Sequence, residues 1–206
     1  MEDTNNSIIL TTERLILRPW AEDDAQALYQ YAKDPEVGPI TGWPVHTDED
    51  HSRAVIKEIL FQPETYAIVL KGENSPVGSI GLMIGGKSNF PIPGNEGEIG
   101  FWIGVPYWGR GLVPEATIEL MRHGFDDLGL DTIWCGYFDG NEKSKRVQEK
   151  CGFKYHHTDK DIPWPLMNDI RTIHITNYPK TEWIAQAKGT DPMSRKQDTG
   201  TDPLSR

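Results

Sequence analysis

The sequence lacks several features that would each point to a particular class of protein. Only two of its 206 residues are cysteines, Cys135 and Cys151, and they form no C-x-x-C pair. A disulfide framework or a cysteine metal site is therefore not expected. No apolar run approaches the ~18 residues of a membrane span. The first 14 residues have no basic segment followed by an apolar one, as a signal peptide would. We predict a cytoplasmic protein with free thiols and no membrane partner.

Basic charge is also scarce. The chain has 21 Lys and Arg against 31 Asp and Glu, a formal net charge of −10. A general nucleic-acid binder needs basic surface to displace counterions from phosphate, so we expect no nucleic-acid partner. Hydrophobic residues make up 37% of the chain and include seven Trp, which is enough to build a core.

The C-terminal segment differs from the rest of the chain. Residues 190–195 (TDPMSR) and 201–206 (TDPLSR) nearly repeat each other, and both are polar and contain Pro. Without apolar periodicity such a segment has no face to bury. We predict a single domain over residues 1–187 and a disordered tail without catalytic role over residues 188–206.

Apolar patterns upstream of the tail predict alternating strands and helices. Strands are predicted at 15–17, 66–70, 77–84, 98–105, 131–138, 153–157 and 171–178. Helices are predicted at 25–32, 47–60, 114–128 and 141–151, with loops at 38–44 and 87–97. The strands at 66–70 and 77–84 are close enough to form an antiparallel hairpin.

Residues 98–125 carry the most informative local pattern: a strand, a glycine turn and a helix opened by Pro114. The unpaired amides and the dipole of a helix N-terminus attract anions, and Gly109 and Gly111 let the backbone approach a phosphate. The turn is not a P-loop, because no Lys-Ser or Lys-Thr follows the glycines. It is a poor dinucleotide fingerprint, because Pro114 replaces the third glycine. An ordinary structural turn is the alternative.

A second motif makes the pattern more specific. Residues 141–153 read NEKSKRVQEKCGF, residues 12–18 read TERLILR, and residues 98–111 read EIGFWIGVPYWGRG. In combination these motifs resemble the GNAT superfamily of acyl-CoA N-acyltransferases, and in particular its ribosomal-protein-alanine N-acetyltransferase branch (the RimJ/RimL type). The resemblance spans roughly residues 10–184. It implies an α/β domain with a mixed, largely antiparallel central sheet and helices on both faces.

The resemblance also implies an activity: direct transfer of an acetyl group from acetyl-CoA to a primary amine, either a protein N-terminus or a small-molecule amine. The amides of Arg110, Gly111, Leu112 and Val113 would hold the cofactor pyrophosphate, and the backbone of Ile103, Gly104 and Val105 would pair with pantetheine. No metal is implied, and nothing in the sequence supports an oligomer. The alternative is a non-catalytic module of the same fold that binds an acyl-CoA or a protein.

Glu98 is the first candidate for general base, because it begins the strand that leads to the glycine turn. It could face the amine directly or through water. An ordinary Glu has a pKa of about 4.3, so this role needs burial or a water relay. The alternative is a solvated carboxylate at a strand end. Glu96, in the preceding loop, is the second candidate.

The resemblance places Asn141 and Ser144 beside pantetheine and the thiol, where Ser144 could hydrogen-bond the leaving sulfur as a catalytic group. The alternative is that both residues only cap a helix. Many relatives carry a Tyr that protonates the thiolate, but Gln148 stands at that place and has no titratable proton. Trp43, in the loop at 38–44, is a candidate to line the acceptor site or to pack in the core.

Histidines and charges complete the sequence expectations. His156 and His157 are adjacent on a predicted strand, so we expect them on opposite faces, unable to share a metal. Residues 1–64 carry 13 acidic and 5 basic side chains, which would favour a cationic acceptor. A basic cluster could meet the phosphates of coenzyme A; it comprises Lys143, Lys145, Arg146, Lys150 and Lys154. The alternative is a solvated surface.

Overall fold

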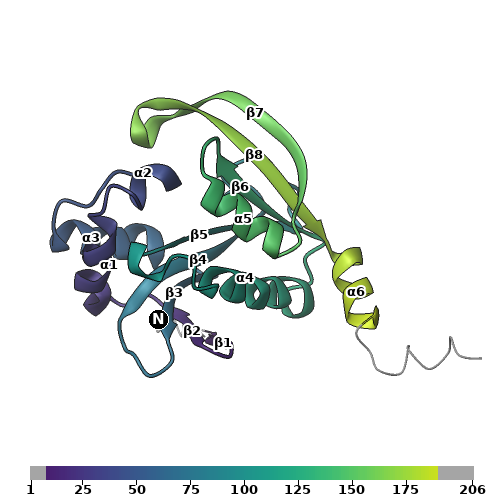
Figure 1. Ribbon diagram of the computed structural model, residues 1–206, viewed down its shortest axis with the longest axis horizontal. Coiled ribbons are helices and arrows are strands. Elements are labelled where there is room, and N and C mark those ends of the chain that lie inside the picture. Colours follow the sequence, from purple (N-terminus) through teal and green to yellow (C-terminus); the bar gives the residue numbers. More distant parts are fainter. Residues whose placement is uncertain (1–7, 190–206) are drawn as a thin grey trace, which may run out of the picture.

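The computed structural model describes residues 8–189, which form one eight-stranded sheet with helices on both faces (Figure 1). The strands are β1 (Leu10–Thr11), β2 (Leu15–Pro19), β3 (Thr65–Leu70), β4 (Pro76–Ile84), β5 (Glu96–Ile103), β6 (Thr132–Phe138), β7 (Lys154–Trp164) and β8 (Asp169–Pro179). Their order is β1-β2-β3-β4-β5-β6-β8-β7, and only the β5–β6 pair is parallel. The prediction of a mixed, largely antiparallel sheet is confirmed.

The α-helices are α1 (Ala25–Ala32), α2 (Gly38–Thr41), α3 (Glu49–Val55), α4 (Leu112–Arg122), α5 (Glu142–Lys150) and α6 (Lys180–Gly189). Side chains alternate across a strand, so β3 serves two cores. Tyr66 and Ile68 pack in the cluster that contains α4, while Ala67 and Val69 pack in the cluster that contains α1. Burial on both sides of the strand explains its unbroken apolar sequence.

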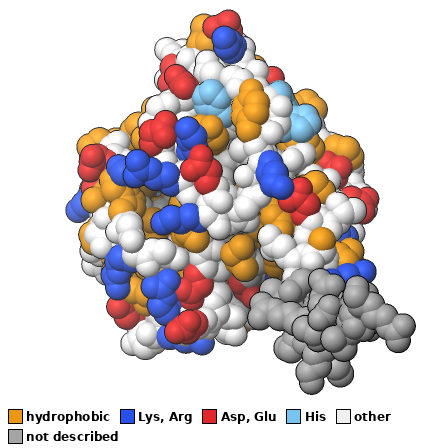
Figure 2. Space-filling model, turned by 45° about the vertical axis from the view of Figure 1, so that its right-hand side comes forward, with side chains coloured by type: hydrophobic (Ala, Val, Ile, Leu, Met, Phe, Trp, Pro, Cys, Tyr) orange, Lys and Arg blue, Asp and Glu red, His pale blue; other side chains and the backbone are white. Residues whose placement is uncertain are grey.

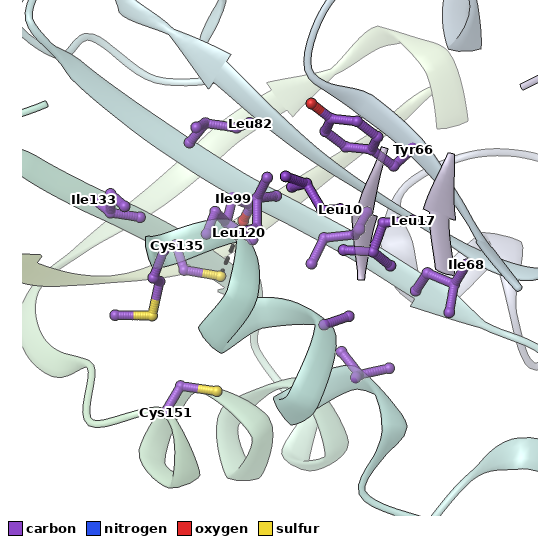
Figure 3. Packing of buried hydrophobic residues seen from close by; sticks show 14 of the residues in the cluster. Leu10, Leu17, Tyr66, Ile68, Leu82, Ile99, Leu120, Ile133, Cys135 and Cys151 are labelled. Atoms are coloured by element: carbon purple, nitrogen blue, oxygen red, sulfur yellow. Dashed lines mark hydrogen bonds between the residues drawn. The ribbon is translucent and has the colours of Figure 1, made fainter. Parts of the chain in front are cut away.

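Both cysteines lie in the larger core, and both are free thiols (Figure 3). The Cys135 thiol on β6 donates a hydrogen bond to the Ile99 carbonyl at 3.1 Å. Burial raises the pKa of Cys135, and it raises the pKa of Cys151 to about 12. Neither thiol is a reactive thiolate at neutral pH, because the thiolate is the form that burial disfavours.

Several boundaries differ from the predictions. Helix α4 begins at Leu112 and not at Pro114, because Gly111 takes the left-handed conformation of an N-cap (φ 74°). Pro114 is then the third helical residue, where an N–H would have no partner within the helix. The predicted loop at 38–44 contains α2, which ends at Gly42 with φ 99°. In α3 the cap is Asp48, whose side chain accepts from the His51 amide.

The last two strands are longer than predicted. Strands β7 and β8 form a long hairpin around a short helical turn, Pro165–Met167, which lies between the two predicted strands. The predicted alternation of the two neighbouring histidines is wrong, because the register shifts between Tyr155 and His157. This bulge brings the Nδ1 atoms of His156 and His157 to 2.7 Å. No cluster of three or more metal-ligating side chains occurs within residues 8–189.

Helix α6, which follows β8, includes Lys188 and Gly189, the first two residues of the predicted tail. The rest of that segment lies outside the described residues. Among the helices of residues 8–189, none combines the length and the apolar character needed to cross a membrane.

Candidate active site

Strands β5 and β6 diverge in the middle of the sheet. They pair from Glu96 with Thr132 to Ile99 with Cys135, after which β5 continues along β4 alone and β6 along β8 alone. Two neighbouring cavities lie at the resulting gap. The "turn cavity", of about 360 Å³, extends along the glycine turn and α5. The "glutamate cavity", of about 280 Å³, contains Glu98. They share part of their lining, namely Ile40, Thr41, Phe101, Asn141 and Ser144.

The glycine turn presents backbone amides to the turn cavity. Gly109 and Gly111 have φ values of 73° and 74°, which favour glycine, and a Cβ at Gly109 would meet no atom within 4 Å. As an N-cap without a side chain, Gly111 leaves the first amides of α4 free for a ligand. The Val113 side chain is buried in the core, so its bulk does not fill the approach to these amides.

Arg110 is placed differently from its neighbours in the turn. It does not line the turn cavity, whereas Gly111, Leu112 and Val113 do. Its guanidinium lies over the Tyr107 ring at 5.3 Å, and its carbonyl accepts a hydrogen bond from Arg14 at 3.0 Å. These contacts hold the turn in place.

Three residues of the predicted basic cluster line the turn cavity: Lys143, Arg146 and Lys150. Lys143 Nζ lies 3.5 Å from the centre of the Trp108 ring. Lys145 and Lys154 instead form ion pairs with Glu142 and Glu182. On the face shown in Figure 2, Lys and Arg side chains stand among Asp and Glu side chains and form no extended patch of one sign. Three of the five basic side chains therefore bring positive charge to the turn cavity.

The end of β5 offers fewer free backbone groups than the sequence suggested. The strand stops at Ile103, the Gly104 amide donates to the Val77 carbonyl at 2.9 Å, and Val105 begins a short helical turn. Backbone groups of an antiparallel pair alternate in direction, so the amides of Phe101 and Ile103 point into the gap. Of the three residues predicted to pair with pantetheine, Ile103, Gly104 and Val105, only Ile103 lines the turn cavity. The Ile103 carbonyl already accepts from the Trp108 indole at 2.9 Å.

Glu98 is a buried carboxylate, 5% exposed, in the wall of the glutamate cavity. Ser88 Oγ (2.8 Å), the Asn89 amide (2.7 Å) and Asn89 Nδ2 (3.1 Å) donate hydrogen bonds to it. Burial raises the pKa of Glu98, and the three donors partly oppose that rise. The sequence alone did not identify Ser88 and Asn89, because they lie in a loop with no periodic pattern.

Glu96, the second candidate base, is placed elsewhere. Its carboxylate accepts a hydrogen bond from the Trp134 indole, and it lines neither cavity. Trp43 packs edge-on against Trp102 at 5.9 Å, and it also lines the glutamate cavity.

The start of α5 holds Ser144 at the junction of the two cavities. Asn141 caps the helix by accepting from the Ser144 amide at 3.1 Å, and its Nδ2 donates to the Ile40 carbonyl at 3.2 Å. The Ser144 hydroxyl accepts from Gln148 Nε2 at 3.2 Å, which leaves the hydroxyl hydrogen free to point into the gap. Gln148 is itself fixed, because Thr176 donates to its Oε1 at 2.7 Å.

Similarity to known proteins identifies the family of this chain. Residues 14–154 match the acetyltransferase (GNAT) domain family, and the chain therefore belongs to the GNAT acetyltransferases. It is 33% identical over 150 residues to an uncharacterized N-acetyltransferase of Bacillus licheniformis, covering 70% of this chain and 82% of that protein.

Solved structures of this family share the fold. One is a GNAT-family acetyltransferase of Bacillus anthracis, with a TM-score of 0.73, 24% identity, and 84% of this chain and 99% of that chain covered. Another is the ribosomal-protein-S5-alanine acetyltransferase of Vibrio fischeri, with a TM-score of 0.63, 19% identity, and 85% and 98% covered. At these identities the likeness supports the fold alone.

Proposed function

We propose that this chain is an N-acetyltransferase that transfers the acetyl group of acetyl-CoA directly to a primary amine. The observation that carries the proposal is the meeting of two different cavities at Ser144. One is lined by free helix amides and basic side chains, and the other holds a single buried carboxylate. Such a pair of cavities fits a phosphate-bearing thioester on one side and an amine on the other.

The lining of the turn cavity suits acetyl-CoA. The amides of Gly111, Leu112 and Val113 fit the pyrophosphate, and Arg146 and Lys150 fit further phosphate charge. The amide of Ile103 points into the gap, where it can hydrogen-bond pantetheine or polarise the thioester carbonyl. When bound, acetyl-CoA supplies an acyl group activated as a thioester.

Glu98 and Ser144 then have complementary roles. Glu98 accepts a proton from the ammonium group, directly or through water, and frees the nitrogen lone pair. The nitrogen forms a bond to the acetyl carbon while the carbon–sulfur bond breaks. Ser144 donates a hydrogen bond toward the sulfur, and the second amine proton ends on the thiol. The products are an N-acetyl amine, coenzyme A and one proton, which Glu98 returns to solvent, so atoms and charge balance.

The RimJ/RimL-type branch is part of the proposal as a sequence resemblance, supported by the motifs at residues 12–18 and 98–111, and it does not fix the acceptor. The two buried free thiols support a reducing, cytoplasmic compartment. A non-catalytic acyl-CoA-binding module is the second candidate, favoured by the buried Gln148 in place of a titratable acid.

Calorimetry with acetyl-CoA and a thiol-release assay test the proposal together. We expect saturable binding below millimolar concentration, and thiol release that depends on an added amine, with the acetylated amine identified by mass spectrometry. Absence of binding would contradict both candidates. Binding without amine-dependent thiol release would support the binding module.

A further inference from the structure

Helix α2 lines both cavities through Ile40 and Thr41, and hydrogen bonds tie it to α5, β7 and β8. Three carbonyls in and after α2 accept side-chain hydrogen bonds: Pro39 from Arg171 (3.0 Å), Ile40 from Asn141 (3.2 Å) and Gly42 from Trp164 (2.7 Å). In Figure 1 the tip of the β7–β8 hairpin reaches toward α2. Because these donors come from three elements, α2 is a fixed wall of the glutamate cavity.

Four carbonyls around this cavity are already paired. The carbonyls of Ile40 and Gly42 are occupied as described, Gly136 accepts from Gln148 at 3.1 Å, and Ile99 accepts from the Cys135 thiol at 3.1 Å. A peptide that entered by its N-terminus would bring amide groups that lose water and need new partners. With these four carbonyls occupied, the Phe101 amide on β5 is a backbone group that faces the gap. The wall therefore offers a peptide few hydrogen-bond partners and is better suited to a body without peptide groups.

The charge of the cavity also limits which amines can bind in it. Among the described lining residues Glu98 is the only charged side chain, and the wall includes six aromatic ones: Trp43, Phe90, Phe101, Tyr137, Phe138 and Trp164. One carboxylate can balance one ammonium group in a buried site. The further positive charges of a polyamine or aminoglycoside would have no partner there, whereas aromatic faces favour flat apolar surface and an adjacent cation.

We infer that the acceptor is a small primary amine with one positive charge and a flat apolar body, and not a peptide N-terminus or a polyamine. This inference rests on the proposed transfer reaction and specifies its acceptor. The ammonium group faces Glu98, the apolar body lies among the aromatic side chains, and the nitrogen reaches the junction of the cavities at Ser144.

The first test compares three acceptors with the full chain and acetyl-CoA: 2-phenylethylamine, spermidine and trialanine amide. We expect kcat/KM for 2-phenylethylamine to exceed the other two by about tenfold or more. Binding supplies a second readout, because Trp43 and Trp164 line the cavity, so 2-phenylethylamine alone should change tryptophan fluorescence saturably. Preference for spermidine or the peptide would overturn the acceptor class and leave the transferase intact. Acetyl-CoA binding with no product from any amine would overturn both.

A second test changes the charge of the cavity. Leu166 lines it at the hairpin turn and is 61% exposed, so substitution there should not affect folding. Leu166→Asp adds a carboxylate at the mouth and should raise kcat/KM for 1,5-diaminopentane relative to 2-phenylethylamine by about twofold to fivefold, the range of an exposed ion pair. Leu166→Asn, of matched size without charge, should leave the ratio unchanged. Equal ratios in both variants would contradict the argument from charge.

Discussion

Replacement of Glu98 by Gln is the sharpest test of the proposed chemistry. Gln has the shape of Glu and can still accept hydrogen bonds at one oxygen, but it cannot accept the amine proton. The side chain lines the glutamate cavity and not the turn cavity, which contains the turn that is proposed to hold the pyrophosphate. The change should therefore separate the chemical step from acetyl-CoA binding.

The hydrogen bonds of Glu98 set the expected magnitude. An ionised carboxylate has about four acceptor positions. Ser88 and Asn89 fill three of them, so about one is left for the amine or a water. These donors spread the negative charge and weaken the base, which favours the lower half of the ~10²–10⁴-fold range of acid–base catalysis. We expect kcat to fall about 10²–10³-fold, equivalent to about 2.7–4 kcal/mol of barrier.

The pH dependence should change as well. Burial raises the pKa of Glu98, and the base acts only as the carboxylate. For the wild type, kcat/KM should therefore rise with pH through this raised pKa, which lies above the ~4.3 of an exposed Glu. The Glu98→Gln variant should lack this rise of kcat/KM with pH. Because the folded pKa lies above the unfolded one, the stabilising contribution of Glu98 is largest at low pH and is lost as pH rises through the folded pKa. Relative to wild type, the variant should gain stability from acidic to neutral pH.

The assay is thiol release at several pH values, with calorimetry to measure acetyl-CoA affinity. Glu96→Gln is the matched control, because Glu96 lies on the same strand, lines neither cavity and should leave kcat within about twofold. A Glu98→Gln variant with kcat within threefold of wild type would refute the reasoning. So would an equal loss in Glu96→Gln.

Three further variants test other parts of the site. Gly111→Ala should lower the free energy of unfolding by about 1–2 kcal/mol in urea titrations, because φ is 74° and the nearest atom to a Cβ, at 3.6 Å, leaves strain without a clash. An unchanged midpoint would contradict this. Gln148→Leu should lower kcat several-fold and leave the KM for acetyl-CoA unchanged, since the Ser144 hydroxyl loses its donor; an equal effect on KM would indicate a merely structural role. Arg146→Ala combined with Lys150→Ala should weaken acetyl-CoA binding in calorimetry and make its affinity less dependent on salt concentration. Unchanged affinity at low salt would show that neither side chain binds the phosphates.

Local patterns predicted most elements of the fold. The strand and hairpin signals at residues 66–84 and the Asn cap of α5 were sufficient, because each depends on neighbours in the chain. The predictions were wrong where the structure depends on an unusual backbone conformation or on residues that are distant in the sequence. Helix α4 begins early because Gly111 adopts a left-handed cap, and α2 forms within a segment that Pro and Gly marked as loop. The bulge at His156 depends on the register with β8.

For the site, the sequence by itself determined the family motifs, the glycine turn, and Glu98 and Ser144 as candidates. Their environment was decided by tertiary structure. The divergence of β5 from β6 creates the gap, a loop brings Ser88 and Asn89 onto the Glu98 carboxylate, and α2 closes one wall. The physical reason is that a side chain's burial, hydrogen-bond partners and pKa depend on groups that are distant in sequence, and only the packed sheet brings those groups together.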